Sequence, residues 1–183
     1  MLIIKEAFDE ADIEQIRQLY EAAFPTSEKK PFSLILEKRA VGAVEILMIE
    51  DDKRRFRGLM ITILHKDMVL IDYFAIEEKS RGIGIGSDVL KLFTARYAKK
   101  RVFLEIESTV SEDVEDYAMK LRRKAFYQKN GLAPMNFLVD LFGVEMEIMT
   151  FHCDITFEEY QGMLVHVYGE KVRDKVRFVR NIR

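Results

Sequence analysis

The chain has 183 residues, of which 49% are hydrophobic and 33% are charged. This composition fits one domain of ordinary size with a core of its own, and it excludes a disordered chain. The net charge of −2 excludes the strong basic field of a protein that binds nucleic acid through its phosphates. The single cysteine, Cys153, cannot form an internal disulfide, and no apolar run approaches the roughly 18 residues of a membrane span. We therefore expect a cytoplasmic protein that binds neither nucleic acid nor a membrane.

The first half of the sequence predicts two helices followed by an antiparallel meander of strands. After a short strand over residues 2–7, Asp9 is placed to cap a helix that runs to about Phe24. Pro31 suits the first turn of a second helix, which ends near Gly42. Only short turns separate the strands that follow, so neighbouring strands must run antiparallel. These strands are expected over residues 44–49, 56–64 and 68–76.

The second half predicts further helices and strands. Thr156 and Glu159 have the spacing of a capping box at the start of a last helix. The whole order favours an α/β chain of α+β order over a fully parallel sheet. We expect the main domain over residues 1–150, with residues 151–183 as a strand and helix extension of the same domain. Between the meander and Thr156, helices are expected over residues 87–100 and 113–130, and strands over residues 102–107 and within 135–151.

The most informative segment is the glycine-rich stretch after the third strand of the meander. Its sequence, Arg81-Gly82-Ile83-Gly84-Ile85-Gly86-Ser87, leads directly into a helix. Glycines let the backbone approach an anion closely, and the free N–H groups at a helix start attract phosphate. Arg81 adds a positive charge. The segment therefore predicts a pyrophosphate cradle, and the simpler alternative is a tight turn that binds nothing.

A dinucleotide is the alternative ligand for such a loop. Glu105 and Glu107 follow the loop by about twenty residues, where an acidic residue could bind a ribose. The glycine spacing, however, is G-x-G-x-G rather than G-x-G-x-x-G. The loop also follows an antiparallel meander, whereas a dinucleotide fold would need further strand–helix units after it. Both features weaken the dinucleotide interpretation.

The segment from Arg81 to Gly86 matches the Q/R-x-x-G-x-G/A signature of the GCN5-related N-acetyltransferases (the GNAT family), which this chain resembles. Two further segments resemble motifs of that family, Leu104-Glu105-Ile106 and the stretch RRKAFYQKNGL that begins at Arg122. The resemblance extends, in the order of elements, over roughly residues 1–150. It implies a mixed, splayed, mostly antiparallel central sheet with helices on both faces, acetyl-CoA as co-substrate, and a homodimer as the common assembly.

The resemblance also implies roles for individual residues. Tyr127 occupies the position of the acid that protonates the departing CoA thiolate. Glu105 matches the general base of some family members, with Asp72 and Glu107 as alternatives. The backbone of Ala75 and Ile76 would pair with the pantetheine arm. The pyrophosphate would be bound by Arg81 and by the backbone N–H groups of Gly82, Ile83, Gly84, Ile85, Gly86 and Ser87.

These expectations describe an acetyl-CoA-dependent N-acetyltransferase that acts directly on a primary amine of a small molecule or a protein. The carboxylates of Asp72, Glu105 and Glu107 suggest a cationic acceptor such as a polyamine or an amino sugar. The three histidines are isolated and lack the spacing of metal ligands, so no metal is expected. Two alternatives stay open: a non-catalytic sensor that binds acyl-CoA, and a dinucleotide-dependent oxidoreductase.

Overall fold

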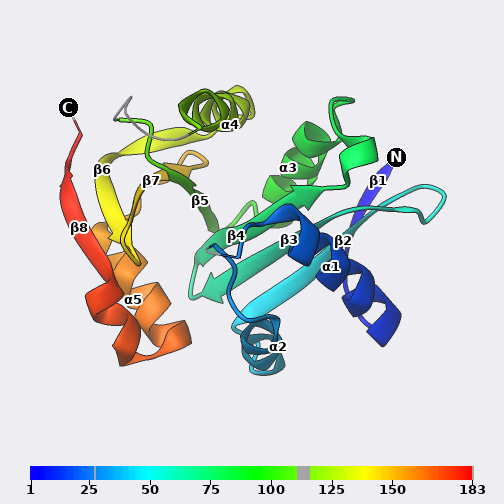
Figure 1. Cartoon of the computed structure of the whole chain (residues 1–183), viewed down its shortest axis with the longest axis horizontal. Coiled ribbons are helices and arrows are strands. Elements are labelled where there is room, and N and C mark those ends of the chain that lie inside the picture. Colours follow the sequence, from blue (N-terminus) through cyan, green and yellow to red (C-terminus); the bar gives the residue numbers. More distant parts are fainter. Residues whose placement is uncertain (27, 111–115, 183) are drawn as a thin grey trace. The chain divides into compact units, whose positions relative to one another are not determined.

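The computed structural model describes residues 1–26, 28–110 and 116–182. It divides into two compact units, an N-terminal unit of Met1–Ala98 and a C-terminal unit of Lys99–Arg183. Each unit contains four antiparallel strands with helices packed against them (Figure 1).

The N-terminal unit is built on the expected meander. Its strands lie in the order β1-β2-β3-β4, and every neighbouring pair is antiparallel. Four consecutive residues of β2, from Ile46 to Ile49, are buried, so side chains on both faces of the sheet are covered. The strands are β1 (Leu2–Glu6), β2 (Val44–Asp51), β3 (Phe56–His65) and β4 (Met68–Ile76).

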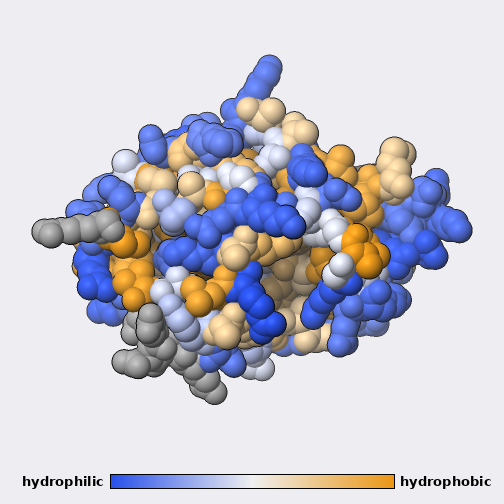
Figure 2. All heavy atoms as spheres, turned by 90° about the horizontal axis from the view of Figure 1, so that it is seen from above, coloured by the Kyte–Doolittle hydropathy of each residue, from blue (hydrophilic) through white to orange (hydrophobic). Residues whose placement is uncertain are grey.

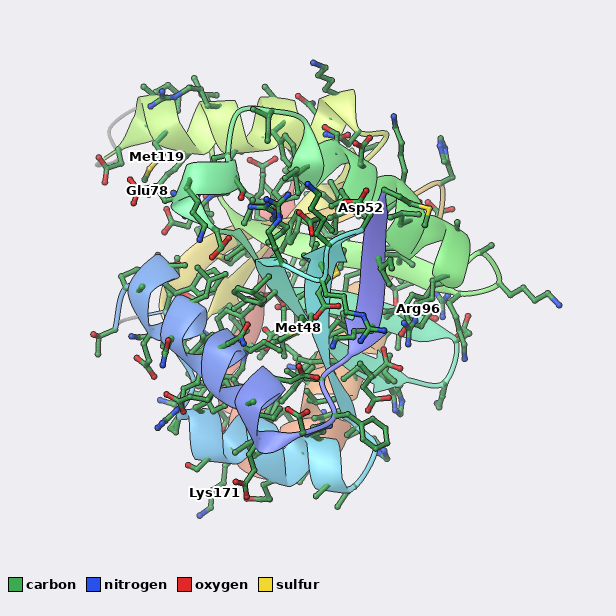
Figure 3. The ribbon with its side chains drawn as sticks, turned by 90° about the vertical axis from the view of Figure 1, so that its right-hand side faces the viewer. Met48, Asp52, Glu78, Arg96, Met119 and Lys171 are labelled. Carbon is green, nitrogen blue, oxygen red and sulfur yellow. The ribbon has the colours of Figure 1, made fainter. Side chains whose placement is uncertain are left out.

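Three helices cover this sheet. The helices α1 (Glu10–Ala23) and α2 (Phe32–Ala40) lie against one face, and α3 (Ile85–Arg96) lies against the other (Figure 3). Met48 of β2 lies at the centre of the sheet in that view, where its side chain is 1% exposed. Asp9 caps α1 by accepting a hydrogen bond from Asp12 N, as expected.

The C-terminal unit contains four further antiparallel strands, in the order β5-β7-β6-β8. The expected capping box of Thr156 and Glu159 is present at the start of its last helix. The bounds are β5 (Arg101–Glu107), α4 (Tyr117–Lys129), β6 (Ala133–Leu141), β7 (Val144–Thr150), α5 (Phe157–Tyr168), a 3₁₀ turn (Glu170–Lys175) and β8 (Val176–Asn181).

Several element boundaries differ from the sequence prediction by a few residues, and three of these differences are at helix starts. The helix expected from residue 87 begins at Ile85, because Gly84 adopts the left-handed conformation that starts it. Pro31 precedes α2 as its N-cap residue and does not lie in its first turn. The helix expected from residue 113 is described from Tyr117 onward, and residues 113–115 lie outside the described residues.

The surface of the molecule is mixed in character. In the view of Figure 2, hydrophilic residues are spread over the surface with apolar residues between them. Among the described residues, no helix has both the length and the apolar character needed to cross a membrane.

Candidate functional site

The glycine-rich segment connects the end of β4 to the start of α3. A single 3₁₀ turn (Glu78–Ser80) follows β4, with Ser80 N and Arg81 N donating to the carbonyls of Glu77 and Glu78. Gly82 and Gly84 then adopt φ angles of 78° and 92°, in the left-handed region where side-chain-bearing residues are strained. The two glycines therefore permit the reversal of the chain into α3.

The backbone N–H groups at the start of α3 have the geometry that suits an anion. The first hydrogen bonds of this helix run from Ser87 N and Asp88 N to Gly84 O, at 3.0 and 3.2 Å. The N–H groups of Ile85 and Gly86 therefore belong to the first helical turn, which has no acceptor within the helix. The segment from Arg81 to Gly84 is exposed, so a ligand can reach it. Together with the dipole of this 12-residue helix, these groups favour a phosphate.

Arg81 extends the site back to the end of β4. Its Nε donates a hydrogen bond of 2.9 Å to the carbonyl oxygen of Ile76. The structure therefore brings together the residues predicted to bind the pyrophosphate and the backbone predicted to bind pantetheine. Ala75 and Ile76 pair with Leu59 and Gly58 of β3 along one edge of β4.

Two supports of this loop were not predicted from the sequence. A Cβ atom on Gly58 would lie 2.4 Å from Ala75 O, so β3 can approach the end of β4 this closely only with glycine there. Arg57 donates to Ser80 Oγ at 3.0 Å and to Asp51 Oδ2 at 2.8 Å. Hydrogen bonds from Arg55, and then from Arg57, hold the pKa of the Asp51 carboxyl well below its usual range. In the sequence, Gly58 could have been noticed as a lone glycine within a strand pattern, whereas no motif marked the contacts of Arg57.

Asp72 lies in an irregularity of β4. Tyr73 pairs with Ile61 and Ile71 pairs with Thr62, so Asp72 is the extra residue of a β-bulge. Its side chain is 5% exposed, and both carboxylate oxygens accept hydrogen bonds from Lys30 Nζ, at 2.7 and 2.9 Å. The predicted alternative base is therefore held in a bidentate ion pair.

The other two carboxylates considered as bases lie on β5, and each has a partner. Glu105 Oε1 accepts a hydrogen bond of 2.5 Å from the hydroxyl of Tyr160, which is fully buried in α5. Glu107 forms an ion pair with Lys120 of α4, with 2.5 Å between Oε2 and Nζ. Tyr160 is thus a neutral partner of Glu105, and Lys120 is a cationic partner of Glu107.

Tyr127 lies near the end of α4, half-buried. Its ring makes an edge-to-face contact with the ring of Phe126 at 5.2 Å. Within the part of the chain that the structure describes, its hydroxyl has no hydrogen-bond partner. Burial raises its pKa to about 12, against a small lowering by Arg123. The hydroxyl therefore keeps its proton at neutral pH and can donate it in a hydrogen bond.

A buried ionic cluster holds α4 against the sheet of the C-terminal unit. Glu147 of β7 is 1% exposed and accepts hydrogen bonds from Thr109 N and Thr109 Oγ1, both at 2.8 Å. Lys124 Nζ lies 2.6 Å from its other oxygen. None of the residues of α4 is buried, so charged contacts such as this one position the helix that carries Tyr127. Among the described residues no group of histidine, cysteine and acidic side chains is arranged to hold a metal.

Comparison with known proteins defines the fold. Neither a protein-family model nor a curated protein sequence matches the chain. Among solved structures, it is similar to a protein from Bacteroides thetaiotaomicron assigned to the GNAT family of acetyltransferases. The TM-score is 0.74 at 20% identity, over 91% of this chain and 98% of that one.

Two structures of spermidine N-acetyltransferase from Vibrio cholerae are also similar. One, in complex with CoA and spermine, has a TM-score of 0.60 at 14% identity, over 81% of this chain and 94% of that one. The other, a dodecamer in an intermediate state, has a TM-score of 0.60 at 14% identity, over 87% and 95%. The expected mixed, mostly antiparallel α/β architecture is confirmed, and the fold of this chain is that of the GCN5-related N-acetyltransferases.

Proposed function

We propose that this protein is an N-acetyltransferase that transfers the acetyl group of acetyl-CoA directly to a primary amine. The observation that carries the proposal is the glycine-rich segment that opens α3 a few residues after the buried strand β4, with Gly82 to Gly84 exposed and the first helical N–H groups following them. The similarity in fold to proteins that bear this activity, one of them in complex with CoA, supports it. Within each unit the described strand pairs are antiparallel, which disfavours the parallel dinucleotide-binding fold.

In this proposal the cofactor is bound mainly by backbone groups. The pyrophosphate lies on the N–H groups of residues 82–87, with Arg81 as its cation. The pantetheine arm pairs with the backbone of Ala75 and Ile76, as an added strand does. A backbone N–H of this segment then polarises the thioester carbonyl and stabilises the oxyanion of the tetrahedral intermediate.

We propose Glu105 as the general base. An acceptor amine arrives as an ammonium and loses one proton to the carboxylate, directly or through a water molecule. The free nitrogen attacks the carbonyl carbon, the C–N bond forms, and the C–S bond breaks to release CoA thiolate. Asp72 is less suited, because both oxygens of its carboxylate already accept hydrogen bonds from Lys30.

Tyr127 is proposed to stabilise the departing sulfur. A thiol has a pKa of about 8.5, whereas that of Tyr127 is about 12. Complete proton transfer from Tyr127 to the thiolate would therefore be uphill by about 5 kcal/mol. We conclude that Tyr127 donates a hydrogen bond to the thiolate and that solvent supplies the final proton.

Calorimetric titration with acetyl-CoA, with NADH in parallel, tests the cofactor assignment. We expect micromolar binding of acetyl-CoA that is lost in Gly84→Glu, because the new carboxylate repels the pyrophosphate. Gly143→Glu is the matched control, since Gly143 has a φ of 89° and equally open surroundings in the β6–β7 turn. Binding of NADH instead of acetyl-CoA would refute the proposal.

Release of free CoA in the presence of primary amines tests the catalytic step. Glu105→Gln should lower kcat by about 10²- to 10⁴-fold, the usual contribution of a general base, with acetyl-CoA affinity unchanged. Tight binding of acetyl-CoA without turnover of any amine would favour the sensor alternative.

A further inference from the structure

Lys30 and Asp72 form an ion pair that links the α1–α2 connection to β4. The two residues are 42 positions apart in the sequence, and the ammonium contacts both oxygens of the carboxylate. The Lys30 side chain is 27% exposed and the Asp72 side chain 5%. Of the two charges, the positive one is therefore the more accessible from solvent.

The backbone of Lys30 is fixed by two buried tyrosines. Lys30 N donates a hydrogen bond of 3.0 Å to the hydroxyl of Tyr73, and Lys30 O accepts one of 2.9 Å from the hydroxyl of Tyr20. The Tyr73 hydroxyl in turn donates to Glu28 O at 2.9 Å. These contacts hold the connection at the point from which the lysine side chain extends to Asp72.

The ion pair of Lys30 and Asp72 also lies beside a cluster of aromatic rings. Lys30 Nζ lies 5.2 Å from the centre of the Tyr73 ring, a cation–π distance. Tyr73 is held edge-on by Tyr20 and Phe24, with ring centres 4.8 and 5.0 Å away. A carboxylate beside an aromatic ring is the combination that binds an alkylammonium ion. In this molecule the ammonium group of Lys30 contacts both the Asp72 carboxylate and the Tyr73 ring, where the ammonium group of a ligand would bind.

The proposed cofactor path places this pair at the reactive end of acetyl-CoA. With the pyrophosphate on residues 82–87 and the pantetheine arm on Ala75 and Ile76, the thioester lies further back along β4. Asp72 precedes Ala75 by three residues, which is about 10 Å along an extended strand. The bulge turns Asp72 toward Lys30, on the face that also carries the Tyr73 ring.

We propose that Lys30 determines acceptor specificity by excluding a second positive charge, so that the acceptor is an amine with a single cationic centre. This inference rests on the proposed N-acetyltransferase function. It narrows the expectation of a cationic acceptor such as a polyamine or an amino sugar, because the carboxylates that suggested one already have internal partners. The spermine bound by the Vibrio cholerae enzyme represents the acceptor class that this chain rejects.

Two amines that differ only in the second charge test the inference, 1,5-diaminopentane and hexan-1-amine. The wild-type protein should show a kcat/KM at least tenfold higher for hexan-1-amine. Lys30→Met removes the ammonium and leaves Asp72 as an open anion, so that preference should fall at least tenfold. Lys30→Arg is the matched control, which keeps the charge and should keep the preference.

Binding measurements separate this inference from the proposed function. Calorimetric titration of the diamine into CoA-saturated Lys30→Met should show binding that the wild-type protein lacks. If acetyl-CoA binds but no amine is acetylated, the proposed function fails, while a gain of diamine binding in Lys30→Met still supports the exclusion by Lys30. Equal use or equal binding of the two amines by the wild-type protein overturns the inference, even where Lys30→Met does not fold. An unchanged preference in folded Lys30→Met, without new diamine binding, also overturns it.

Discussion

Gly58→Ala tests whether the close approach of β3 to β4 shapes the cofactor site. Gly58 pairs with Ile76 at the end of β4, next to the backbone proposed to bind pantetheine. The added Cβ would lie 2.4 Å from Ala75 O and 3.2 Å from Ile76 Cα. Both atoms belong to the backbone, so no side-chain rotation can relieve the contact.

The magnitude follows from these distances. Ordinary van der Waals contact begins at 3.4 Å, so Ala75 O and the new Cβ must separate by about 1 Å. A displacement of that size would weaken one or two backbone hydrogen bonds to pantetheine, each with a net value of about 0.5–1.5 kcal/mol. The expected loss is about 0.5–3 kcal/mol, or roughly 2- to 150-fold in the Kd for acetyl-CoA. Forcing an extra methyl group into packed structure also costs about 1–3 kcal/mol of folding stability.

Calorimetry with acetyl-CoA and urea unfolding measure the two effects separately. Gly162→Ala is the matched control, because Gly162 is an exposed position of α5 where an added Cβ meets no atom within 4 Å. That substitution should leave acetyl-CoA affinity unchanged and raise helix stability by about 0.5–1 kcal/mol. The reasoning is refuted if Gly58→Ala binds acetyl-CoA within twofold of wild type and unfolds at the same urea concentration.

Three further predictions concern the C-terminal unit. Tyr127→Phe should lower kcat by about 10- to 150-fold, the effect of losing one hydrogen bond to a charged group, without changing the Kd for acetyl-CoA. Burial raises the pKa of Tyr127 to about 12, so the wild-type pH–rate profile should show no loss of activity from this residue below about pH 10. A kcat that falls near pH 8 in the wild-type protein but not in Tyr127→Phe would contradict this prediction. Lys124→Met leaves the buried Glu147 carboxylate without its cation and should lower the free energy of unfolding in urea by about 3 kcal/mol. The control, Arg122→Met at an exposed position of the same helix, should lower it by less than about 0.5 kcal/mol. Equal effects of the two substitutions would contradict the interpretation of a buried ion pair. Thr156→Ala removes the capping box of α5 and should cost about 1 kcal/mol in the same assay, and an unchanged midpoint would show that the cap is dispensable.

The order of elements could be predicted because local signals mark it. Asp9 and Thr156 cap the first turns of α1 and α5, and each capping hydrogen bond is made with a residue only three positions further along the chain. The meander followed from short turns between apolar strands, which leave antiparallel pairing as the only geometry. The start of α3 was placed two residues late, because the conformation of Gly84 rather than a capping side chain defines it.

The candidate site could be predicted where it is contiguous in the sequence. The residues from Ile76 to Ser87 lie together because one strand, one turn and one helix start follow each other directly. The supports of that segment come from elsewhere in the chain. Gly58 meets Ala75 only through the pairing of β3 with β4, and Lys30 reaches Asp72 only once α1 and α2 are packed on the sheet. The lone glycine in the strand pattern was a sequence signal for the first of these contacts, and no motif marked the second.

The carboxylates show most clearly what the sequence could not provide. Strand alternation placed acidic side chains on a sheet covered by helices, where an unpaired carboxylate would be desolvated and suited to act as a base. In the folded chain, however, a buried charge is tolerated when it has a partner of opposite charge, and Asp72 forms an ion pair with Lys30. Glu105 instead accepts a hydrogen bond from the neutral hydroxyl of Tyr160, which can remain a donor to the other oxygen when the carboxylate takes a proton. Our proposal of Glu105 as the base therefore depends on how each carboxylate is paired once the chain has folded.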